Sequence, residues 1–294
     1  MRKTLTAVLV LCVAMGAFAA DKSMKKVKRV PAVGPSYAGA VNAAAVGKNA
    51  QAAARVGPGL VLMETTYDFM TNNSMGRHVH NYGDGSISVV RTGSEGAIGT
   101  WPDRGSFFSF RDIGANFSLP LSKVETNRVG WGNLSALTTG ENVIVAHGGL
   151  QVNVDALKGF GIWTSNITGN FPTGSDPTWP RIVADGADVL HIVVTHSTFV
   201  PFTDVGSQIP VYGRSTDKGI TWEFRFLFQP PGAAPGDRPD TTNGLWIGGG
   251  DADAYSIAAF GNKVGVAAFA SYDAGFNSNE IMFAESSDNG ATWT

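Results

Sequence analysis

One eight-residue pattern occurs twice in the sequence, as STDKGITW at 215–222 and as SSDNGATW at 286–293. An Asp in such a stretch can accept backbone N–H groups of its own turn, and Gly adopts the left-handed backbone that other residues resist. The Thr restarts a strand, and the Trp offers an apolar plate to the adjoining sheet. The pattern therefore predicts a structural hairpin turn. Its residues are Ser215, Asp217, Gly219, Thr221 and Trp222, and then Ser286, Asp288, Gly290, Thr292 and Trp293.

The two turns belong to a longer repeat of roughly fifty residues, which is typical of β-propeller blades. Each of four units reads as a strand, a tight turn, an apolar strand, a variable loop and a third strand that ends in the pattern. The tight turns lie at 83–85, 139–142, 185–188 and 261–263. Two stretches, FRDIGANF at 110–117 and WTSNITGNF at 163–171, are interpreted as eroded copies of the pattern. Matching units favour an all-β propeller over a β-sandwich.

Both copies resemble the Asp-box, or BNR repeat, of the sialidase-like β-propellers. In that family the box joins the third and fourth strands of a blade, on the face away from the active site, and is structural. Three further motifs are similar to those of uncharacterised secreted bacterial propellers. They are Tyr-Asp-x-x-Thr-Asn at 67–72, Asp-Arg-Gly at 103–105 and Arg-x-Gly-Trp at 128–131.

The resemblance implies more blades than the sequence contains. Sialidase-like propellers have six, so we expect about four blades of a six- or seven-bladed propeller. The chain ends at Thr294, directly after the second box, where a fourth strand is due. We therefore expect the propeller to be incomplete at its C-terminus. The alternative is a small propeller closed by the strand GLVLMETTYDF at 59–69.

The N-terminal region predicts export. Residues 1–20 combine a basic start, an apolar run and small residues, as a cleaved signal peptide does. Residues 21–59 are rich in Ala and Lys and read as a flexible tether, and 60–294 form the propeller domain. The only cysteine is Cys12, and the formal net charge of −2 carries no basic bias for nucleic acid. We expect a secreted or cell-surface bacterial monomer with no membrane span after signal cleavage.

The repeat also predicts where a ligand binds. The starts of the first strands and the loops after the second strands share one face, where propellers usually bind ligands. Several arginines there could bind a carboxylate sugar, although they could instead brace loops. The candidate ligand-binding residues are Arg77, Asp103, Arg104, Arg128, Trp131, Arg181, His196, Asp251, Asp253 and Asp273.

Catalysis and metal binding have weaker signals. Sialidases use three arginines, a Tyr nucleophile with a Glu, and an Asp acid, but Glu64 and Glu125 have no matching Tyr here, and Arg77 lies in GRHVHN rather than in the family's aromatic-Arg-Ile-Pro. We assign no catalytic residue. We expect no metal and no cofactor, although the aspartates of GGGDADAY could bind Ca²⁺.

The sequence favours a non-catalytic module that binds a glycan or an extracellular protein. One alternative is a sialidase-like glycoside hydrolase with part of its active site beyond Thr294. The other is a surface or matrix scaffold.

Overall fold

The computed structural model describes residues 60–67, 69, 75–96, 99–120, 122–167, 177–196, 209–228, 247–248, 255–271 and 279–294. The chain divides into two units, Met1–Leu60 and Val61–Thr294, and every strand that the structure describes lies in the second. The predicted signal peptide and tether lie outside the described residues. Nowhere in these ranges is there a helix long and apolar enough to cross a membrane.

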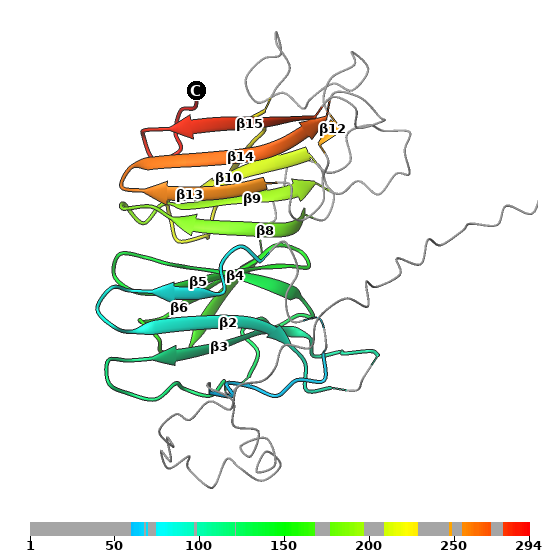
Figure 1. The fold of residues 1–294 in the computed structure, drawn as a ribbon, viewed down its shortest axis with the longest axis vertical. Helices are drawn as coiled ribbons and strands as arrows, with labels where there is room; N and C mark the ends of the chain where they lie inside the picture. The colour runs from blue at the N-terminus through cyan, green and yellow to red at the C-terminus, as the bar shows by residue number, and fades with distance from the viewer. Residues whose placement is uncertain are drawn as a thin grey trace, which may run out of the picture. The chain divides into compact units, whose positions relative to one another are not determined.

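The second unit folds into four antiparallel sheets (Figure 1). The first contains β1 (Val79–Asn81), β2 (Ile87–Gly93) and β3 (Gly105–Arg111). The second contains β4 (Gly130–Ala136), β5 (Asn142–His147), β6 (Gln151–Asp155) and β7 (Trp163–Ile167). The third contains β8 (Pro177–Ala184), β9 (Leu190–His196), β10 (Ile209–Ser215) and β11 (Glu223–Arg225). The fourth contains β12 (Ile247–Gly248), β13 (Tyr255–Phe260), β14 (Lys263–Ser271) and β15 (Asn279–Ser286).

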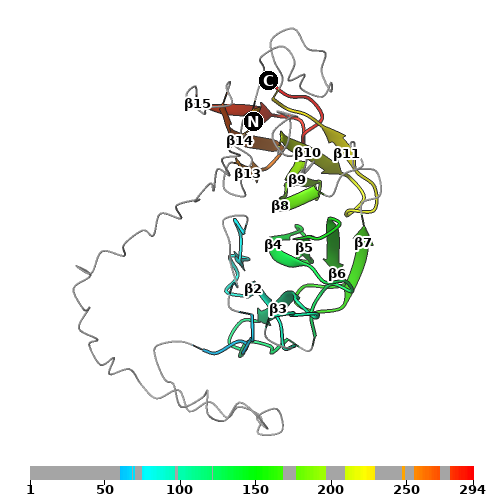
Figure 2. The same ribbon diagram turned by 90° about the vertical axis from the view of Figure 1, so that its right-hand side faces the viewer.

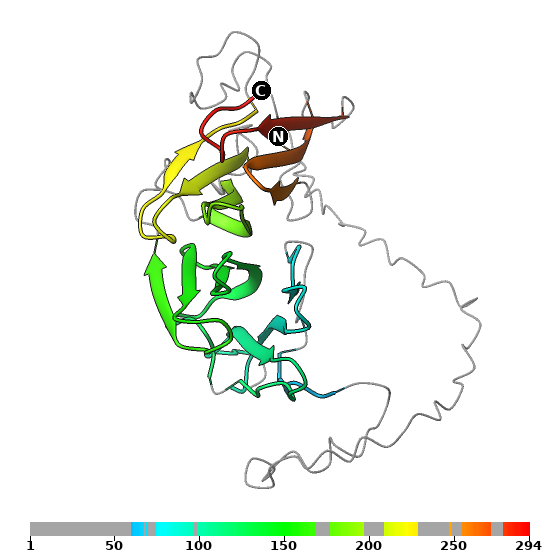
Figure 3. The same ribbon diagram turned by 90° about the vertical axis from the view of Figure 1, so that its left-hand side faces the viewer.

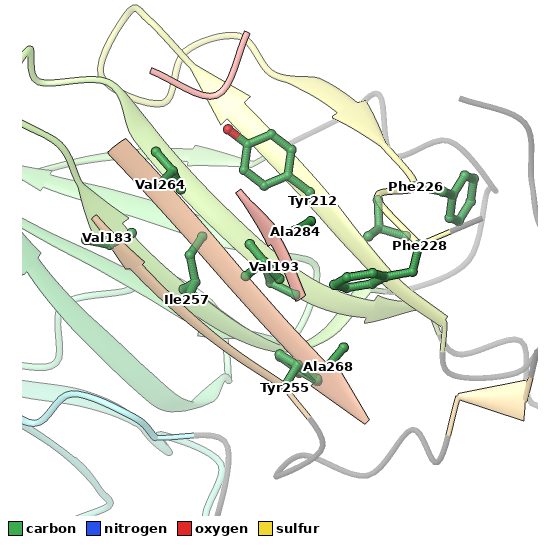
Figure 4. Packing of buried hydrophobic residues seen from close by; sticks show 12 residues of the cluster. Val183, Val193, Tyr212, Phe226, Phe228, Tyr255, Ile257, Val264, Ala268 and Ala284 are labelled. Carbon is green, nitrogen blue, oxygen red and sulfur yellow. The ribbon is translucent and has the colours of Figure 1, made fainter. Parts of the chain in front are cut away.

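The sheets pack on one another in chain order (Figures 2 and 3). The second strands, such as the β-branched runs of β5 and β9, are buried on both faces because each lies inside its sheet and between neighbouring sheets. Three apolar clusters fill the spaces between successive sheets. In the last, Val193 and Tyr212 of the third sheet meet Ile257 and Val264 of the fourth (Figure 4). Sheets packed face to face in this order are blades, and the predicted all-β propeller fold is confirmed.

The two repeated turns are built alike. In the first, the Ser215 hydroxyl donates to Asp217 Oδ1 at 2.8 Å and accepts the Gly219 N–H at 2.8 Å. The Thr221 N–H donates to Asp217 Oδ1 at 2.9 Å, and the Trp222 indole N–H donates to the Gly219 carbonyl at 3.1 Å. The second copy makes the same four bonds at 2.7, 2.9, 2.8 and 3.0 Å. The two turns therefore share one internal hydrogen-bonding pattern.

These turns also lie where they were predicted, at the junction of a third and a fourth strand. The first copy joins β10 to β11, so that Arg214 pairs with Glu223. At the second copy, Glu285 and Thr294 exchange two backbone hydrogen bonds of 2.9 Å, at the position that matches the Arg214–Glu223 pair.

The hairpin turns share one end of the sheets with the tight turns between first and second strands. Lys218 in the first hairpin turn lies 3.0 Å from Glu141 in the β4–β5 turn. In the second hairpin turn, the Asn289 N–H donates to the Asn262 carbonyl of the β13–β14 turn at 2.9 Å. We call this the turn end. The opposite end carries the starts of the first strands, as predicted.

One strand assignment in the second unit was wrong. The stretch at 163–167 is the fourth strand, β7, and not the third strand with an eroded turn. The third strand is β6, which follows β5 through a tight turn in which Gly148 and Gly149 both have positive φ. The eroded turn is instead at 155–163, where the Asp155 carboxylate accepts the Gly161 N–H at 2.9 Å.

The eroded turn of the first unit is where it was predicted. After β3, the chain turns and returns at Ser118, whose N–H donates to the Phe110 carbonyl at 2.7 Å. The Val124 N–H then donates to the Ser106 carbonyl at 2.8 Å. The segment after this turn therefore runs beside β3 in the position of a fourth strand.

Candidate functional site

Two tryptophans occupy matching, strained positions at the end opposite the turn end. Trp131 of β4 and Trp179 of β8 each lie three residues before an apolar core residue, Leu134 or Ile182. Both strands have a register shift at the tryptophan, which marks a β-bulge. Their φ angles are +54° and +51°, and a bulky residue with positive φ is an outlier that costs about 1–3 kcal/mol. Such strain points to a function that needs these rings.

A histidine lies between the two tryptophans. The ring of His147, the last residue of β5, has its centroid 5.0 Å from that of Trp131 and 6.5 Å from that of Trp179. The planes of His147 and Trp179 are 14° apart. All three residues are half-buried, so part of each remains open to solvent. We call Trp131, His147 and Trp179 the aromatic strip.

Two arginines lie beside the strip. The Arg104 guanidinium is 4.8 Å from the Trp131 ring centroid and 5.4 Å from that of Tyr67, and its Nε donates to the Val129 carbonyl at 2.8 Å. The exposed Arg128 donates from Nε to the Trp101 carbonyl at 3.0 Å. Burial lowers the pKa of Arg104, and the nearby positive charge of Arg128 lowers it further.

These two guanidinium groups have no acidic partner in the described part of the chain, because none of its carboxylates lies within ion-pair distance of either one. Two neighbouring positive charges that lack a counter-charge form a spot suited to an anion.

The other predicted residues divide into four groups, of which Asp103 is one. Arg181 extends the same end, with its guanidinium 5.2 Å from the ring centroid of Tyr255 in β13. Arg77 links the chain before β1 to β4 through its backbone, and its carbonyl accepts the Leu134 N–H at 3.1 Å. His196 ends β9, but its side chain is outside the described residues, as are Asp251, Asp253 and Asp273.

Asp103 braces a loop. Its carboxylate accepts the Ser94 hydroxyl, the Glu95 N–H at 2.8 Å and the Gly96 N–H at 3.0 Å. Burial alone would raise the pKa of Asp103, but these hydrogen bonds outweigh burial and lower it. The contacts shape the β2–β3 loop that carries Trp101 and Arg104.

His147 and Trp179 were not among the predicted ligand-binding residues. A signal for Trp179 was present, because alignment of the second and third units places it on Trp131. Trp131 itself was predicted because it lies at the start of the second unit. The proximity of His147 to both tryptophans depends on the packing of two sheets, which no local pattern reports.

Glu125, one of the two glutamates considered for a sialidase mechanism, is enclosed. Glu125 is only 1% exposed, and its Oε2 accepts the Ser106 N–H at 2.8 Å. Burial raises the pKa of Glu125, which therefore favours the neutral acid, but the group is enclosed. Within the same residues, no three His, Cys, Asp or Glu side chains gather in a way that could hold a metal ion.

A buried Asp-His-Tyr chain lies instead at the turn end. His191 Nε2 is 3.0 Å from Asp185 Oδ2, and His191 Nδ1 is 2.6 Å from the Tyr212 hydroxyl. The pKa of His191 is lowered by burial, against the opposing effect of its hydrogen bond to the Asp185 carboxylate. Gly290 of the second hairpin turn covers this chain, so it joins the third sheet to the fourth and is closed to substrate.

No protein-family profile and no curated protein matches this sequence. Several solved structures are similar to this chain. A protein of unknown function from Dyadobacter fermentans has a TM-score of 0.45 and 13% identity, over 76% of this chain and 69% of that chain. An ulvan lyase of polysaccharide lyase family PL25 has a TM-score of 0.45 and 12% identity, over 76% and 54%.

A GH43_1 enzyme from Xanthomonas citri in complex with xylotriose has a TM-score of 0.42 and 13% identity, over 79% and 74%. These likenesses concern the fold alone.

Proposed function

We propose that this chain is a non-catalytic module of a secreted or cell-surface, sialidase-like propeller, and that it binds an acidic glycan along the aromatic strip. The observation that carries the proposal is the pair of left-handed tryptophans at matching bulges, with His147 between them. Half-exposed aromatic rings give apolar surface on which the C–H faces of sugar rings can stack. Three aromatic rings in succession suit an oligosaccharide better than a single sugar.

The acidic preference rests on Arg104 and Arg128. Both lie beside the strip, and neither has a carboxylate within ion-pair distance among the described residues. A guanidinium binds a carboxylate or a sulfate through paired, charge-assisted hydrogen bonds. A glycan that carries such a group would stack on Trp131 and neutralise the two arginines together.

The test is isothermal titration calorimetry with an oligogalacturonate, a sulfated heparin oligosaccharide, cellohexaose and xylohexaose. We expect at least one acidic oligosaccharide to bind, and Trp131→Ala and Trp179→Ala each to weaken its binding about tenfold or more. Phe260→Ala is the matched control, because Phe260 is 89% exposed but lies at the turn end. Equal losses in all three variants, or no binding of any oligosaccharide, would contradict the proposal.

The acidic preference has its own test. Arg128→Gln should weaken binding of the acidic oligosaccharide and flatten its salt dependence, because an exposed charge acts through screened attraction. Any binding of a neutral oligosaccharide to the same strip should change little. A variant that weakened both classes equally would show that Arg128 shapes the site rather than recognises an anion.

The absence of catalysis is testable as well. Glu125 is enclosed, and its Oε2 accepts a backbone N–H, so it is not placed to serve as the base of a nucleophile. We expect no release of 4-methylumbelliferone from its sialoside. Sustained release would overturn the non-catalytic part of the proposal and favour the hydrolase alternative.

A further inference from the structure

The two bulges leave backbone groups of the tryptophans without partners in their own strands. A β-bulge interrupts the ladder of hydrogen bonds, and an unpaired buried N–H or carbonyl is strongly unfavourable. In both cases the partner comes from a side chain of a neighbouring sheet. The Trp131 N–H donates to the Thr92 hydroxyl at 2.7 Å, and the Trp179 carbonyl accepts the Tyr255 hydroxyl.

Both hydroxyl-bearing residues are enclosed and firmly placed. Thr92, in β2 of the first sheet, has no exposed surface, and Tyr255, in β13 of the fourth sheet, is 3% exposed. Water therefore competes poorly for these hydrogen bonds. Each bond secures the backbone of a residue whose φ lies in the left-handed region, which a bulky residue keeps only when its surroundings enforce it.

We propose that Thr92 and Tyr255 are positioning residues for the glycan site, each of which holds one tryptophan of the aromatic strip from an adjacent sheet. The expected effect on glycan binding rests on the proposed function, whereas the positioning of the two indole rings does not depend on it. Thr92 sets the backbone of Trp131 from the first sheet. Tyr255 sets the backbone of Trp179 from the fourth, so the geometry of the strip depends on the packing of all four sheets.

The arrangement has a chemical logic. A glycine would adopt positive φ at either bulge without help, but it would supply no ring. A tryptophan supplies the ring and needs an added hydrogen bond to keep the same backbone. If the hydroxyl is removed, the bulge can relax toward a regular strand, which redirects the indole because successive strand residues point to opposite faces.

The experiment uses the isosteric variants Thr92→Val and Tyr255→Phe, made in protein labelled with 5-fluorotryptophan. Fluorine NMR then reports the surroundings of each indole, and the signals are assigned with Trp131→Phe and Trp179→Phe. We expect Thr92→Val to shift the Trp131 signal alone and Tyr255→Phe to shift the Trp179 signal alone. Each variant should also weaken binding of the acidic oligosaccharide by about three- to tenfold, as loss of one buried hydrogen bond does.

Two variants at the turn end are matched controls. Thr221→Val and Tyr82→Phe also remove a hydrogen-bonded hydroxyl, because Thr221 donates to Asp217 and Tyr82 to Asn142. Both can lower thermal stability, but neither should shift the signals of the aromatic strip. A general loss of stability would therefore not reproduce the expected pattern, in which each variant shifts the signal of one tryptophan only.

The outcomes separate the two proposals. Unshifted signals in Thr92→Val and Tyr255→Phe, or shifts equal to those in the controls, would overturn the positioning role. Shifts without any change in affinity would also overturn it, because the held geometry would then not matter for binding. If the wild-type protein binds no oligosaccharide, the proposed function fails, and the crossed shifts alone decide whether the two hydroxyls position the rings.

Discussion

Replacement of Gly219 by alanine tests how the hairpin turns join one sheet to the next. Gly219 has φ +86°, and a Cβ there would lie 2.8 Å from Cγ1 of Val152, which is fully buried in β6 of the second sheet. An L-residue in left-handed backbone costs roughly 1–2 kcal/mol. Overpacking against a buried side chain adds about 1–3 kcal/mol. We therefore expect Gly219→Ala to lower the free energy of unfolding by about 2–5 kcal/mol.

Gly114 is the matched control, because it occupies the eroded turn of the first sheet with φ +70° and has nothing within 4 Å of its Cβ position. Gly114→Ala should lose only the backbone contribution, about 1–2 kcal/mol. Urea unfolding followed by fluorescence measures both. In a Val152→Ala background the clash is gone, so Gly219→Ala should then cost about as much as Gly114→Ala. Equal costs at both glycines in the wild-type background would refute the reasoning.

Two further predictions concern pH. Burial lowers the pKa of His191 and so favours its neutral form. The contribution of His191 to stability is therefore complete above its ordinary pKa of about 6.5, and it falls as the pH drops toward the lower pKa of the folded protein. The urea midpoints at about pH 7.5 and 5.5 should differ less in His191→Gln than in the wild type. Hydrogen bonds from Thr292 lower the pKa of Asp288 to about 2, so the second hairpin turn should weaken only as the pH falls from about 4 to about 2. Carboxyl-carbon NMR checks this, and a midpoint near the ordinary value would contradict it.

Much of the fold was predictable from the sequence because it depends on local chemistry that recurs. The Ser, Asp, Gly and Thr of each hairpin turn bond to one another within eight residues, so the pattern itself specifies the turn. The third strand of the second sheet was misplaced because HGGL reads as the start of a long loop. In the structure, Gly148 and Gly149 make a tight turn there, which only the pairing of β5 with β6 reveals.

The site was less predictable because its geometry depends on contacts between sheets. The order of strands and loops predicts which end of the sheets carries the site and which arginines lie beside Trp131. The left-handed backbone of Trp131 and Trp179 could not be predicted in this way, because tryptophan does not favour it and no turn signature accompanies it. It depends on bulges that Thr92 and Tyr255 stabilise from other sheets, which are far away in the sequence.

Left-handed backbone occurs at both ends of the sheets, but on different residue types. In the hairpin turns it falls on glycine and on polar residues, namely Gly219, Gly290, Lys218 and Asn289, whereas at the site it also falls on the bulky Trp131 and Trp179. Trp131→Ala would lose the ring and keep the strain, but Trp131→Gly would lose both. Glycine should therefore be more stable than alanine at 131, by about 1 kcal/mol, which reverses their usual order in a strand.

Trp163 of β7 is the control for this reversal, because its φ is not positive and alanine should be the more stable replacement there. Urea unfolding of the four variants measures both orders. If the alanine variant is more stable than the glycine variant at both positions, the backbone at 131 relaxes freely when the ring is removed. The strain would then be a consequence of the ring's packing rather than a property of the bulge that the site exploits.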